Sequence, residues 1–530
     1  MGGPHGGGGG RPARGAGAGG GPLGEGLPAH LLRAGVVPVG SGARSGAVLR
    51  GGEQGGRCEV KTSRFLFLLT ALVFPLLASA SGLYVGDRGV RSLGRGGAFV
   101  AGADDLGALW YNPAGLVDAG SSVLLDGSWV RFSTDFTRRV LVTNSAGATQ
   151  TSELPSVSGS SEFLPIPTIA GSWVFGERKQ LVVAAGVLAP QMAVMSYPLT
   201  LDDGSPAPSR YSLVSLEGSL LVIPGVSAAY RPFDFLQLGA GVNVLTGNFV
   251  TRTVFNTSPP ERLLSAPEDP SYDALAELKA TGLLAPSASF GAIVSPAKWL
   301  RVGVSGQLGY TLDAPATVRV RLPSAAVFDQ ARQEGDSARL KLKLPAILRA
   351  GIEVRPLEAL RVELGYAREL WSSHESIDIV AEDVRIYDVS GIPSPFTVPT
   401  ISIPRRFKDS QSFRLGGEYS LSVGSSFAVE VRAGLSYEQS AIPAAYLAPL
   451  TVDTDKVTGS VGLGLRLGQR LRLDAVYSQA FGGQREVSPS EAAVPRINPM
   501  ADEDAPVSPV NGGSYQVRTS ILGFGFRYQL

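Results

Sequence analysis

Apolar and polar residues alternate with a period of two along most of the chain after residue 120. Residues 360–367, 427–438 and 471–478 each place apolar side chains at every second position, with their charged side chains between them. Successive side chains of a β-strand point to opposite faces, so this period is typical of strands whose two faces meet different surroundings. The pattern therefore predicts a chain built mainly from β-strands.

Fourteen segments of this kind are separated by residues that favour turns. They cover residues 121–135, 163–176, 180–192, 211–232, 235–254, 284–296, 299–320, 338–356, 360–380, 407–421, 425–440, 456–468, 471–482 and 515–530. The links between them are alternately long and short. Seven long links cover roughly 136–162, 193–210, 255–283, 321–337, 381–406, 441–455 and 483–514. Six short links lie at 177–179, 233–234, 297–298, 357–359, 423–424 and 469–470.

An even number of strands with short turns at one end and long loops at the other is typical of outer-membrane β-barrels. Lipid offers no hydrogen-bond partner, so a sheet that spans a membrane must close on itself. The strands of a soluble β-sandwich also alternate between apolar and polar residues. The lengths of the connections between the strands favour the barrel. We expect an all-β fold, a 14-stranded antiparallel transmembrane β-barrel in the bacterial outer membrane.

The last predicted strand ends in "ILGFGFRYQL", with Leu522, Phe524, Phe526, Tyr528 and Leu530 on one face. An aromatic-rich alternating terminal strand resembles the signal that the barrel-assembly machinery reads, although the usual terminal Phe is replaced by Leu. An ordinary amphipathic closing strand explains the same pattern. We expect this machinery to be a partner during biogenesis, and outer-membrane lipid and lipopolysaccharide to surround the barrel.

The first 80 residues differ in composition from the rest. Residues 1–60 hold 22 of the 67 glycines and no Lys or Asp, so we expect a disordered leader, either genuine or translated ahead of a true start near Val60. Residues 61–80 have a basic start, an apolar stretch and Ala-Ser-Ala at the end, as a cleavable signal peptide does. A transmembrane helix is the alternative, and Pro75 argues against it.

Charge and metal-ligating residues exclude several functions. The whole chain has a formal net charge of +1, which gives no reason to expect nucleic acid as a partner. Removal of residues 1–80 leaves 39 basic and 43 acidic residues, and it removes the only cysteine, Cys58. The mature chain then has no disulfide and a single histidine, His374. We therefore expect no metal site and no cofactor.

Several stretches together resemble one known family. "LGRGGAFVAGADDLGALWYNPAGL" (93–116) is similar to the N-terminal plug of the FadL/OMPP1/TodX family, including its Asn-Pro-Ala motif. "LPAILRAGIEVRPLEALRVELGYARELWSS" (344–373) resembles that family's Leu-Pro…Trp-Ser hairpin. "KDSQSFRLGGEYSL", "RAGLSYEQSAIP" and "VDTDKVTGSVGLGLRL" follow in the family's order. The family transports long-chain fatty acids and aromatic hydrocarbons across the outer membrane.

The resemblance implies a monomer with a hatch at 81–120 inside the lumen of a barrel at 121–530. It also implies passive transport, in which a hydrophobic substrate enters from outside, reaches an inner pocket and leaves sideways through the wall. Long-chain fatty acids are the expected substrates. Aromatic hydrocarbons taken up by the same mechanism are one alternative, and a structural or adhesive barrel without transport is another.

Within the hatch, Asn112-Pro113-Ala114 is the expected gate, which moves when substrate binds, and a rigid plug is the alternative. Asp104 or Asp105 can cap a short helix at 106–110, and the proline ends that helix. Four glycines of the hatch permit tight packing against the inner wall: Gly94, Gly96, Gly97 and Gly102.

For the sideways exit, the candidate is the third strand, in which Gly186 and Pro190 weaken the hydrogen-bond ladder. The alternative is that the proline simply ends the strand. Residues 271–286 read as an amphipathic helix inside a long outer loop, and its exposed leucines suggest a capture groove or packing against another loop: Leu275, Leu278, Leu283 and Leu284.

Charged residues on the inward faces are numerous, and Arg349 and Arg432 are candidates to bind a carboxylate. Ladders of Arg and Glu that satisfy each other across a lumen explain the same pattern. His374 lies in "WSSHES", which raises the possibility of a hydrolase, but serine neighbours in sequence do not make a triad. We expect no catalytic residues and no enzyme activity.

Overall fold

The computed structural model describes residues 86–143, 146–161, 165–178, 180–189, 194–258, 268–424, 426–501 and 508–530. The chain divides into two compact units, residues 1–74 and 75–530, and all described residues belong to the second. The predicted leader at 1–60, the predicted signal peptide at 61–80 and Pro190 lie outside the described residues. None of the helices in the described part is long and apolar enough to cross a membrane.

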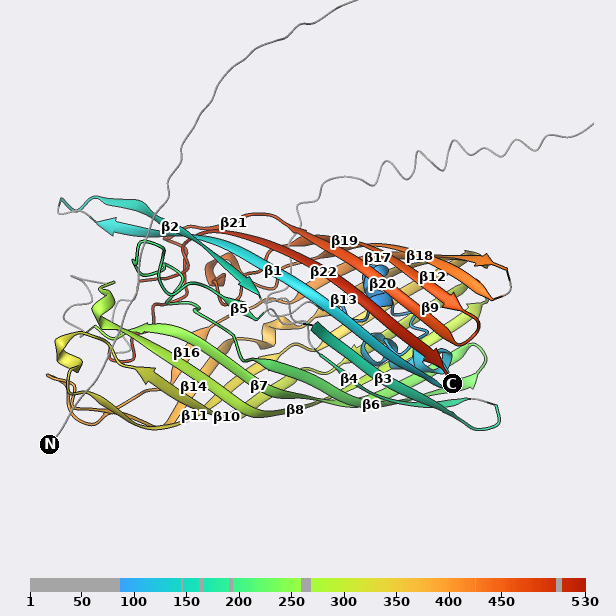
Figure 1. The fold of residues 1–530 in the computed structure, drawn as a ribbon, viewed down its shortest axis with the longest axis horizontal. Helices are drawn as coiled ribbons and strands as arrows, with labels where there is room; N and C mark the ends of the chain where they lie inside the picture. The colour runs from blue at the N-terminus through green and yellow to red at the C-terminus, as the bar shows by residue number, and fades with distance from the viewer. Residues whose placement is uncertain are drawn as a thin grey trace, which may run out of the picture. The chain divides into compact units, whose positions relative to one another are not determined.

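Fourteen strands form a closed ring, as predicted (Figure 1). In ring order they are β1 (Ser122–Thr143), β3 (Pro165–Phe175), β4 (Leu181–Leu188), β6 (Leu220–Phe233), β7 (Leu236–Asn256), β8 (Asp273–Ala297), β9 (Leu300–Gln307), β12 (Ile347–Leu357), β13 (Leu360–Glu369), β17 (Ser410–Val423), β18 (Phe427–Glu438), β19 (Lys456–Leu467), β20 (Leu471–Gly482) and β22 (Gly513–Gln529). Each strand pairs antiparallel with the next, and β22 pairs with β1 over 17 residues. The closed ladder satisfies every strand edge, as a lipid-exposed sheet requires.

Eight further strands extend the ring at the end with the long loops. They are β2 (Thr149–Ser161), β5 (Met195–Ser196), β10 (Tyr310–Arg321), β11 (Arg332–Leu344), β14 (Ser376–Tyr387), β15 (Phe396–Thr397), β16 (Ile401–Pro404) and β21 (Arg485–Val487). The long strand β8 shows how the ring is extended, because one half of β8 pairs with β9 and the other half pairs with β10. Short 3-10 helices η3 (Pro270–Tyr272), η4 (Ala326–Phe328), η5 (Trp371–Ser373) and η6 (Ala444–Tyr446) lie in the long loops.

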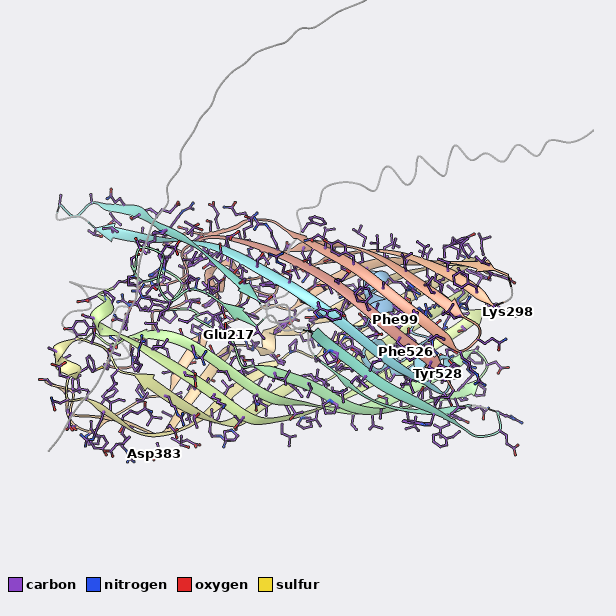
Figure 2. The ribbon with its side chains drawn as sticks, in the orientation of Figure 1. Phe99, Glu217, Lys298, Asp383, Phe526 and Tyr528 are labelled. Carbon is purple, nitrogen blue, oxygen red and sulfur yellow. The ribbon has the colours of Figure 1, made fainter. Side chains whose placement is uncertain are left out.

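All six predicted short links are turns between neighbouring strands, and they gather at one end of the barrel. Lys298 lies in one of these turns, whereas Asp383 lies towards the end with the long loops (Figure 2). The two ends therefore differ as in outer-membrane barrels, where the short turns face the periplasm.

The predicted amphipathic helix at 271–286 is wrong, because these residues are η3 and the first half of β8. Thr281 and Gly282 lie together opposite Asn248, which is a β-bulge, and Gly282 has a φ of 66°. The bulge shifts the inward phase, so that Ala280 and Leu283 both face inward at a spacing of three. A spacing of three between buried residues is also typical of a helix, which explains why the sequence pattern predicted one.

The two faces of the barrel carry different side chains. The outward face is apolar, and the last strand illustrates it, because Leu522, Phe524 and Phe526 are 39–53 % exposed. The inward face towards the short turns is charged, and Glu353 and Glu363 are completely buried there. Alternation in the sequence predicts this division between faces correctly.

Candidate functional site

The residues from Gly86 to Gly120 lie inside the ring and form a compact hatch (Figure 1). Its helices are α2 (Val90–Gly94), α3 (Ala108–Tyr111), η1 (Pro113–Gly115) and α4 (Leu116–Ala119). Helix α2 contacts β18, β19, β20 and β22, whereas η1 contacts β6, β7 and β8 on the opposite wall. Nearly every hatch residue is buried, so the segment fills the cross-section of the lumen.

Buried ion pairs fasten the hatch to the wall. Arg91 binds Glu418 at 2.8 Å, and Arg361 binds Asp104 at 2.5 Å. Glu363 accepts hydrogen bonds from three consecutive backbone N–H groups of the hatch, residues 100–102, at 2.6–2.9 Å. Although burial raises the pKa of Asp104, Arg361 and Arg91 hold that pKa well below its usual value. Removal of one partner from a buried ion pair strongly destabilises the protein. These ion pairs therefore define the position of the hatch.

The Asn-Pro-Ala motif lies against strands β7 and β8. Asn112 is completely buried, and its amide nitrogen donates to the carbonyl oxygens of Val100 at 3.0 Å and Ala292 at 3.3 Å. Its side-chain oxygen accepts from the N–H of Ala114 at 3.2 Å. One side chain thus connects two parts of the hatch with the wall.

The two aspartates predicted as caps, Asp104 and Asp105, do not cap helix α3. Asp104 pairs with Arg361 and Arg91 instead, because these cations lie beside it and a charged partner outweighs a helix terminus. Asp105 accepts a hydrogen bond from Gly107 N–H at 2.8 Å, one residue before the helix begins. The helix starts two residues later than predicted and ends at Tyr111, before Asn112, which is extended with a φ of −162°.

Glycines on the wall surround the hatch, and these were not singled out from the sequence. An added Cβ at each of them would overlap hatch atoms: Gly239, Gly291, Gly303, Gly416 and Gly434. Glycine permits this close approach of two backbones. Of the four hatch glycines singled out from the sequence, Gly94, Gly96 and Gly102 face the wall, whereas Gly97 faces Asp87 within the hatch. Glycines at inward positions of alternating strands are the signal that identifies such a contact surface.

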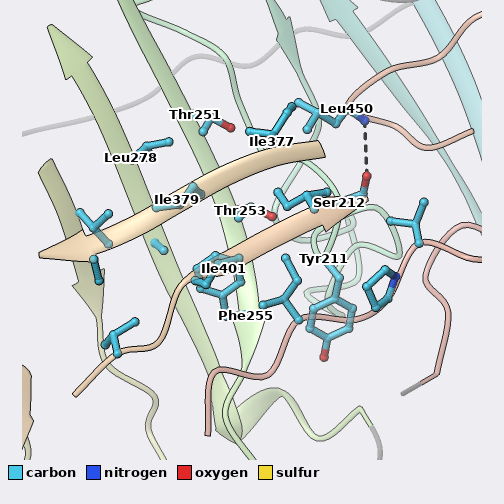
Figure 3. Close-up of a pocket in the computed structure, with 18 of the residues that line it drawn as sticks. Tyr211, Ser212, Thr251, Thr253, Phe255, Leu278, Ile377, Ile379, Ile401 and Leu450 are labelled. Carbon is cyan, nitrogen blue, oxygen red and sulfur yellow. Dashed lines mark hydrogen bonds between the residues drawn. The ribbon is translucent and has the colours of Figure 1, made fainter. Parts of the chain in front are cut away.

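An apolar cavity of about 60 Å³ lies between the barrel strands and the long loops (Figure 3). Its lining includes Thr251, Thr253 and Phe255 of β7, Leu278 of β8, Ile377 and Ile379 of β14, and Ile401 of β16. The loops contribute Tyr211, Ser212 and Leu450, and the Leu450 N–H lies 3.4 Å from the Ser212 hydroxyl oxygen. The walls are therefore mainly apolar, with a few polar groups among them, as in sites for hydrophobic ligands.

The polar groups at the cavity include Arg405, whose side chain is completely buried. Its Nη1 donates to the Thr451 hydroxyl at 3.0 Å. Burial lowers the pKa of Arg405 to about 10, so the guanidinium keeps its charge at pH 7. Sequence reasoning missed this residue, because it lies in an irregular segment where no periodicity assigns a face.

One cluster of packed apolar side chains connects this cavity with the hatch. The cluster contains Leu278 and Ile379 from the cavity wall, and Leu109 and Trp110 from the hatch. It also contains Val182, Ala184 and Ile223 from strands β4 and β6. The apolar tract therefore runs from the long-loop end of the barrel to the hatch and to one side of the wall.

At that side the outer face of the wall has an apolar hollow of about 600 Å³, formed by β3, β4, β6 and β7. Gly186 lines it, and its missing side chain leaves room for Leu109 of the hatch on the inner side. The pairing of β6 with β7 skips Ile223 and Pro224. Proline has no N–H to donate, so the hydrogen-bond ladder between β6 and β7 is interrupted at this seam.

A third cavity, of about 610 Å³, lies at the short-turn end of the hatch. It is lined mainly by charged side chains, among them Arg91, Asp104, Arg361, Glu418 and Arg472. The two sides of the hatch therefore differ in chemistry, with an apolar tract on one side and charges on the other.

Most of the residues proposed from the sequence as substrate contacts lie away from the apolar cavity. Arg432 is held by Glu418 at 2.6 Å, Glu430 at 2.5 Å and Asp474 at 2.7 Å. The Arg349 guanidinium lies 5.1 Å from the ring centre of Trp110 in the hatch. Among the four proposed leucines, Leu278 lines the cavity, Leu275 and Leu283 lie elsewhere on β8, and Leu284 faces outward with 73 % exposure.

Comparison with known proteins gives one family. Residues 71–529 match the family model described as outer membrane protein transport protein (OMPP1/FadL/TodX). No curated protein matches the chain.

Solved structures share the fold at low sequence identity. A FadL homologue from Pseudomonas aeruginosa is 16 % identical with a TM-score of 0.65, and the match covers 85 % of this chain and 100 % of that one. The Ralstonia pickettii toluene transporter TbuX is 18 % identical with a TM-score of 0.52, over 84 % of this chain and 99 % of that one. The Pseudomonas putida toluene transporter TodX is 15 % identical with a TM-score of 0.57, over 84 % and 99 %.

Proposed function

Because the chain belongs to the OMPP1/FadL/TodX family of outer-membrane transport proteins, we propose that it carries long-chain fatty acids passively across the outer membrane. The substrate enters at the long loops, occupies the apolar cavity, passes the hatch and leaves through the wall. The transporter acts as a monomer, binds no cofactor and uses only the concentration gradient. It reaches the outer membrane with a cleaved signal peptide at 61–80 and assembles through the barrel-assembly machinery.

The observation that carries this proposal is the continuous apolar tract from the cavity to the hatch. A fatty acid crosses the lipopolysaccharide leaflet poorly, because charged sugars exclude its apolar tail. Hiding about 16 methylenes from water is favourable by roughly 13 kcal/mol at about 0.8 kcal/mol each. A water-filled pore gives no such gain, whereas a path lined by apolar side chains does.

The charged cavity beyond the hatch supports a sideways exit. An acyl chain that continued straight on would meet Arg91, Asp104 and Arg361, which are ion-paired and unfavourable neighbours for a hydrocarbon. The hollow formed by β3, β4, β6 and β7 offers an apolar route beside the hatch. Substrate leaves there, at the seam that Pro224 weakens, and enters the lipid.

In this proposal the hatch, residues 81–120, is a gate rather than a fixed plug. Asn112, Pro113 and Ala114 move when substrate reaches Leu109 and Trp110, which belong to the same apolar cluster. The hydrogen bond from Asn112 to Ala292 breaks in the open state and holds the closed one.

Aromatic hydrocarbons are the second candidate substrates. Two of the similar structures are named toluene transporters, and an apolar cavity accepts a ring as readily as an acyl chain. A structural or adhesive barrel without transport is the remaining alternative, and it gives no reason for an apolar tract that ends at a hatch.

Uptake by cells that lack their own transporter tests the proposal. Cells expressing this chain are given labelled oleate or labelled toluene, and initial uptake is compared with that of an empty-vector strain. We expect oleate uptake to rise several-fold. If neither compound exceeds the empty-vector control at equal amounts of protein in the outer membrane, the chain is not a transporter of this class.

A further inference from the structure

Arg405 is an unusual residue of the apolar cavity. It follows β16, lines the cavity and has 0 % of its surface exposed. Its Nε and Nη2 atoms have no hydrogen-bond partner, and it forms no ion pair with any residue that the structure describes. By contrast, buried Arg432 is paired with three carboxylates.

Among the described residues that line the cavity, Arg405 is the one cation. His374 packs beside Phe407, and its Nδ1 lies 2.7 Å from the Lys343 carbonyl oxygen, which only accepts. That nitrogen therefore carries the hydrogen. Burial and the charge of Arg405 lower the pKa of His374 to about 4, so its ring is neutral at pH 7.

An uncompensated charge in an apolar site is costly, and it favours an anion that completes the pair. We propose that Arg405 binds the carboxylate of an anionic amphiphile whose chain occupies the apolar cavity, and so selects fatty acids over uncharged hydrocarbons. This inference rests on the proposed transport function and assigns a residue that determines its specificity. The free Nε and Nη2 atoms are the pair of donors that a carboxylate accepts side by side.

The cavity must widen to take such a ligand. Its volume of about 60 Å³ equals roughly two water molecules, so a bound acyl chain displaces the side chains that fill it. Leu450 and Ile497 line it from long loops, and these two residues can move without breaking the barrel ladder.

Two ligands that have the same hydrocarbon chain but different head groups distinguish recognition of the head group from burial of the hydrocarbon chain. Purified full-length protein in detergent is titrated with oleate and with oleyl alcohol, which lacks the charge. For R405M we expect the affinity for oleate to fall at least about tenfold and the affinity for oleyl alcohol to change less than about twofold. R405K keeps part of the oleate affinity, because it keeps the charge without the two parallel donors.

The neighbouring residue provides the matched control. Arg406 is exposed, so R406M binds both ligands like the wild type. Folding is followed by thermal unfolding of each variant. We expect R405M to unfold at the same temperature as the wild type or higher, because it removes a buried charge and the one partner it leaves, the Thr451 hydroxyl, is uncharged.

Three outcomes contradict the inference in different ways. If R405M binds oleate like the wild type, Arg405 does not hold the head group, while the transport function stands. Equal losses for both ligands, with a lower unfolding temperature, assign Arg405 a structural role. If wild-type protein binds neither ligand, the proposed function itself fails.

Discussion

His374 is a buried side chain with a purely structural environment. Its ring lies 5.9 Å from the Trp371 ring and 4.9 Å from the Phe407 ring, measured between centres, and its Nε2 has no partner among the described residues. No serine hydroxyl is hydrogen-bonded to it in the described part of the chain. The geometry therefore offers no support for the hydrolase alternative.

The lowered pKa of His374 predicts how stability depends on pH. The unfolded chain binds this proton near pH 6.5, whereas the folded chain binds it only near pH 4. The stabilisation is complete above pH 6.5 and is lost as the pH falls to about 4. Between pH 7 and pH 4, we expect the free energy of unfolding in urea to fall about 3 kcal/mol more for the wild type than for H374Q.

H374Q removes the titration and keeps a polar side chain, so it controls for every other group that titrates in this range. Equal losses of stability in the two proteins would show that the ring is not held neutral by its surroundings.

For a single residue, the sequence predicts which face of the barrel its side chain occupies. It does not predict which other residue binds that side chain. Alternation placed Glu353, Glu363 and Arg432 inside the barrel correctly, because a strand leaves only two directions. It did not distinguish Arg432, which three carboxylates hold, from Arg405, which lies outside any strand. Partners depend on which strands meet across the lumen, and one sequence does not contain that information.

Among the elements, the hatch and the glycines around it form one contact surface. The inward glycines of β7, β8 and β18 leave space for hatch atoms, and any larger residue would fill that space with its side chain. Gly291 faces the Asn112 side-chain oxygen, which ties the Asn-Pro-Ala motif to this wall. Close packing of two backbones explains why the hatch is compact and buried.

G291A tests this contact. The added methyl group overlaps the Asn112 side chain, so the hatch must shift, at a cost on the order of 1–3 kcal/mol. We expect purified G291A in planar lipid bilayers to show larger or more frequent conductance steps than the wild type. Gly459 provides the control, because a Cβ there meets nothing within 4 Å. Conductance in G291A equal to that in G459A would mean that the motif does not hold the hatch closed.

The elements themselves were largely predictable. The fourteen strands and six short links follow from period-two alternation and turn residues. The prediction of a helix at 271–286 was wrong because the bulge at Thr281 and Gly282 shifts the pattern of inward-facing residues by one position. Sequence periodicity describes a continuous ladder, and it misleads where the ladder contains an extra residue.

The barrel combines a closed ladder with an interrupted seam between β6 and β7. Its outward face is apolar, its lumen is apolar on one side of the hatch and charged on the other, and the hollow in the wall lies at the boundary. The topology was predictable from the sequence. The position of the seam depends on which residues of β6 and β7 lose their pairing at Pro224, and only the structure shows this.

A disulfide across the seam tests the sideways exit most directly. Val226 and Val242 lie opposite each other on β6 and β7, face outward and both line the hollow. V226C/V242C joins the two strands when oxidised and frees them when reduced, because a disulfide links neighbouring strands only at such short range. V304C/A350C places the same bond between β9 and β12, away from the hollow.

The decisive measurement is the initial rate of labelled oleate uptake by cells expressing each double variant, before and after reduction. We expect oxidised V226C/V242C to fall to the empty-vector rate and to recover on reduction, whereas V304C/A350C keeps the wild-type rate in both states. Undiminished uptake by V226C/V242C, with the disulfide shown to be formed, would contradict an exit through this wall.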